Sequence, residues 1–145
     1  MVNLVKIAVG VTTVEELRLR QREFLRKFND KNYPYFYHTT RMMPKKREDI
    51  VSSGSLYWVI KGVICARQKV LDIIKFEDTD GKNRCKIFLT KEIVKTKPVK
   101  KRPFQGWRYL KKHITPQDLA EHINTDFDSA IPIHLQKQLL EMGVI

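Results

Sequence analysis

The residues best suited to chemistry in this sequence form a basic and aromatic block between Lys95 and Lys112. The block contains eight basic residues, three aromatic residues and no acid. Cations can follow a phosphate backbone, and aromatic rings among them can stack on unpaired bases, which contributes about 1–3 kcal/mol per base. The candidate nucleic-acid contacts in this block are Lys100, Lys101, Arg102, Phe104, Gln105, Trp107, Arg108 and Tyr109. The alternative interpretation buries Phe104 and Trp107 in the core and leaves the lysine ammonium groups in water.

A second basic block covers residues 38–47, and its four cations lie at or just before the start of a predicted short helix. Free N–H groups and the helix macrodipole favour an anion at such a position, so the block predicts a phosphate contact. Its candidate contacts are Arg41, Lys45, Lys46 and Arg47. An ion pair of Arg41 with Glu48 or Asp49 is the equally open alternative.

Two further polar candidates, Arg67 and Gln68, interrupt an otherwise apolar strand. Such residues either line the mouth of the fold, within reach of a ligand, or simply face water. The sequence leaves these two interpretations open.

The charge distribution supports a polyanionic partner. The chain carries 28 Lys and Arg against 16 Asp and Glu, a formal net charge of +12. Residues 41–71 carry +5 and residues 91–113 carry +8, whereas residues 114–145 carry −4. A clustered basic face suits RNA, DNA, free phosphate or an anionic membrane surface. The alternative is a lysine-rich surface that only keeps the protein in solution.

Signals for an enzyme or a metal site are weak. The sequence has no nucleophile elbow, no glycine-rich phosphate loop and no histidine pair at metal-binding spacing. Residues 78–83 faintly resemble a calcium loop but are expected to form a hairpin turn. Cys65 and Cys85 fall in predicted strands and are expected to be buried, inert thiols. We therefore predict no catalytic residue, no cofactor and no metal, and an enzyme is the less favoured class.

The predicted elements must position these residues within one domain, residues 1–145. A buried strand begins at Val2, and helical spacing of apolar residues with a cap at Thr12 or Thr13 predicts a long helix ending near Phe28. The remaining predicted elements are a strand over 35–41, a helix over 44–51, strands over 56–60, 63–74 and 84–89, and two short C-terminal helices from Pro116 and Pro132. The hairpin connections favour an α+β fold with a small, mostly antiparallel barrel. The basic barrel region would span 1–113, and the acidic helical segment 114–145.

The expected cellular compartment follows from the length of the apolar runs and from the cysteine content. No apolar run is long enough for a transmembrane helix, and the first residues do not have the pattern of a signal peptide. With only two cysteines, we expect a cytoplasmic protein with reduced thiols and no membrane partner.

Four motifs, at residues 38–47, 54–62, 66–68 and 102–110, resemble the signature blocks of one family. It is the alphaproteobacterial domain-of-unknown-function family 1489, and the likeness extends from Leu4 to Gly143. This resemblance implies a bacterial cytoplasmic protein and implies no activity. The chain is also more weakly similar to PUA-like barrels, which bind RNA or modified bases. In those proteins a short helix, a glycine turn (here Gly54) and a strand form the lip of the ligand groove.

The sequence thus predicts a nucleic-acid-binding module, with RNA favoured over DNA. If about five phosphates are engaged, the log–log dependence of affinity on salt should have a slope near −3.5 for a single strand. The first alternative is a protein-interaction or assembly factor whose basic face binds an acidic partner, with the acidic segment 114–145 as a cover. The second is an enzyme acting on RNA or a nucleotide, with Arg67, Gln68 and Asp72 in its groove. Nothing in the sequence indicates the oligomeric state.

Overall fold

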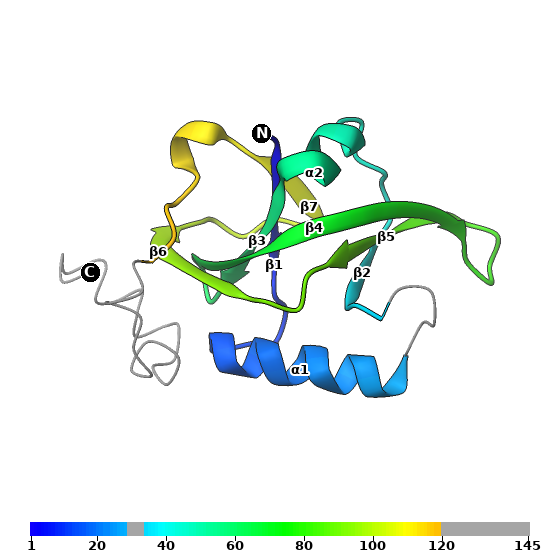
Figure 1. The fold of residues 1–145 in the computed structure, drawn as a ribbon, viewed down its shortest axis with the longest axis horizontal. Coiled ribbons are helices and arrows are strands. Elements are labelled where there is room, and N and C mark those ends of the chain that lie inside the picture. Colours follow the sequence, from blue (N-terminus) through cyan, green and yellow to red (C-terminus); the bar gives the residue numbers. More distant parts are fainter. Residues whose placement is uncertain (29–33, 120–145) are drawn as a thin grey trace.

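The computed structural model describes residues 1–28 and 34–119 and shows two helices packed on a strongly bent sheet (Figure 1). In chain order the elements are β1 (Asn3–Ile7), α1 (Val14–Lys27), β2 (Tyr37–Thr40), α2 (Arg47–Ser53), β3 (Ser55–Ile60), β4 (Val63–Glu77), β5 (Asn83–Leu89), β6 (Val94–Lys100), β7 (Trp107–Leu110) and the 3-10 helix η1 (Lys112–Ile114). The α+β class expected from the sequence is confirmed.

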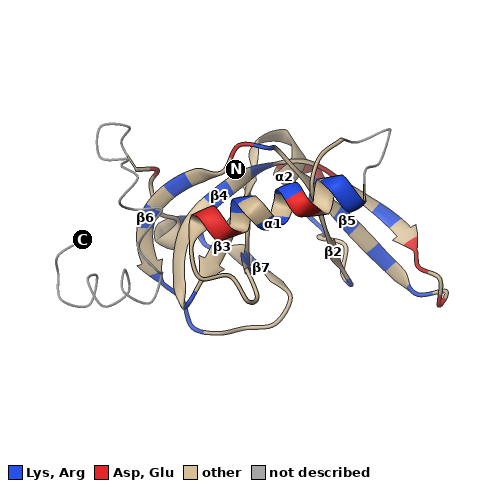
Figure 2. Ribbon diagram, turned by 90° about the horizontal axis from the view of Figure 1, so that it is seen from below, with Lys and Arg blue, Asp and Glu red and all other residues tan. Residues whose placement is uncertain are grey.

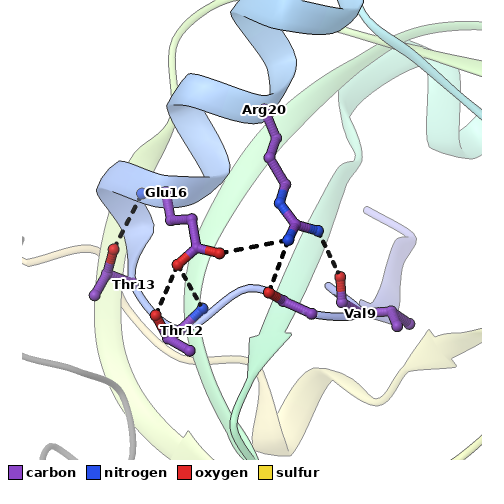
Figure 3. A network of polar contacts seen from close by, with 6 residues as sticks. Val9, Thr12, Thr13, Glu16 and Arg20 are labelled. Atoms are coloured by element: carbon purple, nitrogen blue, oxygen red, sulfur yellow. Dashed lines mark hydrogen bonds and ion pairs between the residues drawn. The ribbon is translucent and has the colours of Figure 1, made fainter.

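The start of α1 is held by polar contacts that the sequence predicted as a capping box. The Thr13 hydroxyl accepts a hydrogen bond from the Glu16 amide at 3.0 Å, and the Glu16 carboxylate accepts one from the Thr12 hydroxyl at 2.7 Å (Figure 3). Arg20, one turn later, donates to the carbonyl oxygens of Val9 and Gly10 at 3.0 and 2.9 Å. The helix is thereby fixed against the loop that leaves β1.

The sheet follows the order β2-β5-β4-β3-β1-β7, and β6 pairs with β4 beside this path. Strand β4 has 15 residues and serves both halves of the sheet: its first half pairs with β3 and β6, and its second half with β5. The pairing of β1 with β3 is parallel, whereas the other strand pairs are antiparallel. A register shift at Val70/Asp72 lies where β4 passes from its partners β3 and β6 to β5, and a second shift at Ile64/Ala66 lies within its pairing with β6.

The expectation of a closed barrel is wrong, because the end strands β2 and β7 do not pair with each other. Strand β2 ends at Thr40 after four residues, and Pro44 shortly beyond it has no N–H to donate to a neighbouring strand. Side chains bridge the two edges instead. The Trp107 indole Nε1 donates to the carbonyl oxygen of Met42 at 3.0 Å, and the Lys46 amide donates to the Tyr109 hydroxyl at 3.2 Å. We call this junction of residues 41–46 with Trp107 and Tyr109 the seam.

The helix predictions also need correction. The second helix begins at Arg47, three residues after Pro44. The helix predicted to begin at Pro116 does not begin there, because Asp118 forms an isolated antiparallel bridge with Thr96. The Leu119 amide donates to the Lys95 carbonyl there, so this segment adds to the free edge of β6. The helix predicted from Pro132 lies outside the described residues, as does most of the predicted acidic cover.

Apolar residues fill both faces of the sheet. The larger core lies on the inner face, which α1 covers through Val14 and Leu17, and Trp58 there is 3% exposed, as predicted. A smaller core on the outer face is closed by Phe104 and Ile114. Cys65 and Cys85 are buried free thiols, and burial raises the pKa of Cys65 to about 12.

The inner core contains one fully satisfied amide network, centred on Gln68. Its side chain exchanges two hydrogen bonds with Gln21, accepts one from the Trp58 indole and donates one to the Thr90 carbonyl, all at 2.7–2.8 Å. Gln68 is 0% exposed. It is therefore a structural residue, with no surface that a ligand could contact.

Replacing Gln68 should be costly. Gln68→Ala leaves the Gln21 amide and the Trp58 N–H without buried partners, so we expect the free energy of unfolding to fall by about 2–4 kcal/mol. Urea denaturation followed by tryptophan fluorescence would measure it, with the exposed Gln105→Ala as the control. Equal stability of the two variants would contradict the assignment of Gln68 to a structural network.

Candidate nucleic-acid interface

The seam brings the two predicted basic blocks together, although they lie about 60 residues apart in sequence. Tyr109 is at its centre. The phenol ring of Tyr109 packs edge-on against Trp107, with centroids 5.0 Å apart and planes at 75°, and the Lys46 ammonium lies 5.5 Å from its centroid. Tyr109 remains 38% exposed and the neighbouring Met42 69% exposed. Exposed aromatic and apolar surface thus lies directly beside cations.

The seam cations are available to a ligand. Arg41, Lys45 and Lys46 are exposed, and none of them forms an ion pair with another residue of the described ranges. The predicted alternative pairing of Arg41 with Glu48 or Asp49 is not formed. A shallow pocket of about 550 Å³, lined by residues 43–49, lies on this part of the surface. Its lining includes the seam cations Lys45 and Lys46 together with the acids Glu48 and Asp49.

Side chains alternate between the two faces of the sheet along β7, so the rest of the basic and aromatic block lies on the other face. Arg108 opposes Val5 on the outer face, where its guanidinium lies 5.7 Å from the centroid of Phe104. The Lys101 ammonium lies 5.8 Å from the same ring. We call this group the outer cluster; it comprises Lys100, Lys101, Arg102, Phe104, Gln105 and Arg108. Figure 2 shows basic residues along β6, while α1 carries both basic and acidic residues and acids lie at the tip of the β4–β5 hairpin.

Several predicted contacts are engaged within the protein. The Arg108 guanidinium donates to the carbonyl oxygens of Gln105 and Trp107 at 2.6 and 2.9 Å. Gln68 is buried, as described above. Arg47 donates to the Ile73 carbonyl at 2.6 Å and pairs with Asp72, which leaves it little freedom to reach a ligand. Arg67 forms two hydrogen bonds of 2.7 Å with Asp118, and this carboxylate raises the pKa of the guanidinium. The acidic partner of Arg67 is 51 residues away in sequence, so no local pattern could have shown it.

Two polar residues that were not among the predicted contacts lie on the inner face behind the seam; of these, His38 was expected from the sequence to be a strand histidine and not a base. Lys6 of β1 stands opposite Trp58 on β3 and Trp107 on β7. The His38 ring of β2 meets Trp58 edge-on at a centroid distance of 6.2 Å. Burial, and then the positive charge of Lys6, lowers the pKa of His38 to about 4. The one available signal was Lys6 itself, a cation in an otherwise apolar alternation.

Other site classes gain no support from the described ranges. No group of three or more His, Cys, Asp or Glu residues among 1–28 and 34–119 is placed to hold a metal ion. The same part of the chain includes no helix long and apolar enough to cross a membrane.

These features define a class of protein: a small α+β domain with an open, strongly bent sheet whose two free edges meet at a basic and aromatic seam. The chain belongs to the family described as "Protein of unknown function (DUF1489)", whose model matches residues 4–145. The family expected from the four motifs is thereby confirmed. No curated protein and no solved structure matches the chain.

Proposed function

We propose that this protein binds single-stranded RNA through the seam. The observation that supports this best is the contact between the two basic blocks. The Tyr109 hydroxyl accepts a hydrogen bond from the Lys46 amide, and the Lys46 ammonium lies over the Tyr109 ring. Unpaired cations can contact successive phosphates, and the exposed edge of the aromatic pair can stack on a base. A duplex keeps its bases stacked within the helix, so an aromatic contact of this kind favours a single strand. An RNA ligand also agrees with the cytoplasmic location expected from the sequence.

The proposal is tested by fluorescence anisotropy with a labelled single-stranded RNA of about twelve nucleotides between roughly 50 and 300 mM salt. Wild type should show a log–log slope near −3.5. The triple variant Arg41→Ala/Lys45→Ala/Lys46→Ala should lose about 2 units of that slope, because three phosphate contacts disappear. Tyr109→Ala should weaken binding about tenfold at constant slope, since it removes stacking and no charge.

Two controls isolate the seam. The triple variant Lys100→Ala/Lys101→Ala/Arg102→Ala removes the same charge from the outer cluster and should change the slope less. Tyr109→Phe keeps the ring and loses only the hydroxyl, so it should bind nearly as wild type. A salt-independent affinity, or equal losses from the two triple variants, would contradict the seam as the RNA site. If Tyr109→Ala leaves the RNA affinity unchanged, the alternative function, binding of an acidic protein partner, would be favoured instead.

A further inference from the structure

Four strands contribute one residue each to a cluster on the inner face, directly behind the seam. Directly opposed residues of paired strands project to the same face, so Lys6 of β1 lies between Trp58 of β3 and Trp107 of β7. His38 of β2 completes the group through its edge-on contact with Trp58. The cluster therefore spans the gap between the two free edges of the sheet. Trp107 belongs both to this cluster and to the seam.

The cluster holds a positive charge that the described residues do not neutralise. Lys6 and His38 are half-buried, and neither forms a hydrogen bond or an ion pair within residues 1–28 and 34–119. Burial lowers the pKa of the Lys6 ammonium. The same face carries the Cys85 thiol of β5, whose pKa is raised by burial, and Lys75 of β4, which stands opposite Cys85 and adds a second positive charge. A half-buried cation without a partner is costly, and an anion placed beside it would offset that cost.

We propose that Lys6 and His38 form a subsite for a terminal phosphate monoester of the RNA bound at the seam. This inference rests on the proposed function. It assigns a position behind Trp107 to the terminal phosphate of the bound RNA. The Lys6 ammonium and a His38 ring N–H donate to the phosphate oxygens, while Tyr109 contacts the adjoining nucleotide.

A terminal phosphate fits this position better than an internal one or a neutral base. A monoester carries up to two charges, whereas an internal diester carries one and continues into a nucleotide on each side. Lys6 is half-buried on the inner face between two paired strands, and a terminal phosphate needs room for one adjoining nucleotide, whereas an internal phosphate needs room for two. A neutral base could accept a hydrogen bond from Lys6 but would leave its charge unbalanced.

The site is tested directly by NMR titration of the His38 imidazole, with uridine 5′-monophosphate as the probe and uridine as its uncharged control. A bound phosphate favours the protonated ring, so the pKa of His38 should rise by about one unit or more with the monophosphate and stay constant with uridine. Lys6→Met should abolish the response, and Lys6→Arg should retain most of it. The exposed Lys82→Met on the β4–β5 hairpin is the matched control and should respond as wild type. Equal titration curves with both probes would overturn the subsite.

Binding of end-modified RNA tests the same idea with the proposed ligand. One hexanucleotide is compared in three forms: 5′-phosphorylated, 3′-phosphorylated and without a terminal phosphate. One phosphorylated form should bind at least about tenfold tighter than the unphosphorylated form, and Lys6→Met should remove that preference while leaving the weaker binding intact.

The combined results of these experiments distinguish the proposed RNA site at the seam from the proposed phosphate subsite. Equal binding of all three oligonucleotides, together with a loss of affinity in Tyr109→Ala, would overturn the phosphate subsite and leave the seam as an RNA site. A phosphate-dependent rise in the pKa of His38 without binding of any oligonucleotide would support the subsite and overturn RNA as its source.

Discussion

Gly54→Ala is expected to destabilise the protein by about 3 kcal/mol or more, and to do so by steric overlap alone. Gly54 follows α2 with φ −84°, a conformation open to any residue. A Cβ atom there would lie 2.0 Å from the Val2 carbonyl oxygen and 2.8 Å from the Ile50 carbonyl oxygen. Both are backbone atoms, and the Gly54 carbonyl itself accepts a hydrogen bond from the Val70 amide at 3.1 Å. Strand β1 cannot move away without losing its pairing with β3, and α2 cannot move away without losing its contacts with β4.

The measurement is urea denaturation, and Gly106→Ala is the matched control. Gly106 has φ +68°, and the nearest atom to an added Cβ is 4.0 Å away. Its substitution therefore costs only the left-handed backbone conformation, about 1–2 kcal/mol. If Gly54→Ala were no more destabilising than Gly106→Ala, the close packing of β1 on α2 at this position would be contradicted.

The second large effect is a loss of stability in mild acid that depends on His38. Its pKa is lowered to about 4 in the folded protein, from an ordinary value of 6.5, first by burial and then by Lys6. Between these values the unfolded chain binds more protons than the folded one. The free energy of unfolding therefore falls as the pH decreases from about 6.5 to about 4, by about 2–3 kcal/mol in total.

The His38→Phe variant should lack this part of the acid destabilisation, because phenylalanine does not titrate. Stability would be measured by chemical denaturation at several pH values between 4 and 7, with His113→Phe, an exposed histidine, as the control. If the free energy of unfolding of His38→Phe and wild type depended on pH in the same way, His38 would not be held neutral in the folded protein. Lys6→Met should make the acid loss smaller, since removing the ammonium allows His38 to protonate more easily in the folded state.

Local structure was largely predictable because it depends on residues near one another in the chain. The apolar spacing predicted α1, and apolar runs bounded by turn residues predicted the long strand β4 together with β3 and β5. The turn at residues 61 and 62 was predicted from sequence, and both residues have the positive φ angles, 51° and 81°, that a tight hairpin requires. Strands β6 and β7 were missed because lysine and proline conceal the β pattern within the basic block.

The candidate site was predictable only as a set of residue types. The sequence singled out fourteen possible contacts, but it could not divide them between the seam, the outer cluster and internal pairs. Arg47 and Arg67 are engaged by Asp72 and Asp118, 25 and 51 residues away in the chain, and Gln68 is buried in an amide network. Those pairings depend on which elements pack together, and residue spacing gives no information on that.

By itself, the sequence determined the approximate positions of α1, α2 and strands β1 to β5, where the positive charge is concentrated and to which family the chain belongs. Only the tertiary structure decided that the sheet stays open and that Lys46 meets Tyr109 at the seam. It also decided that Lys6 lies between two tryptophans with His38 nearby. The physical reason is that side-chain periodicity fixes the face on which a residue lies, whereas strand order and register fix its neighbours, and these depend on contacts between distant parts of the chain.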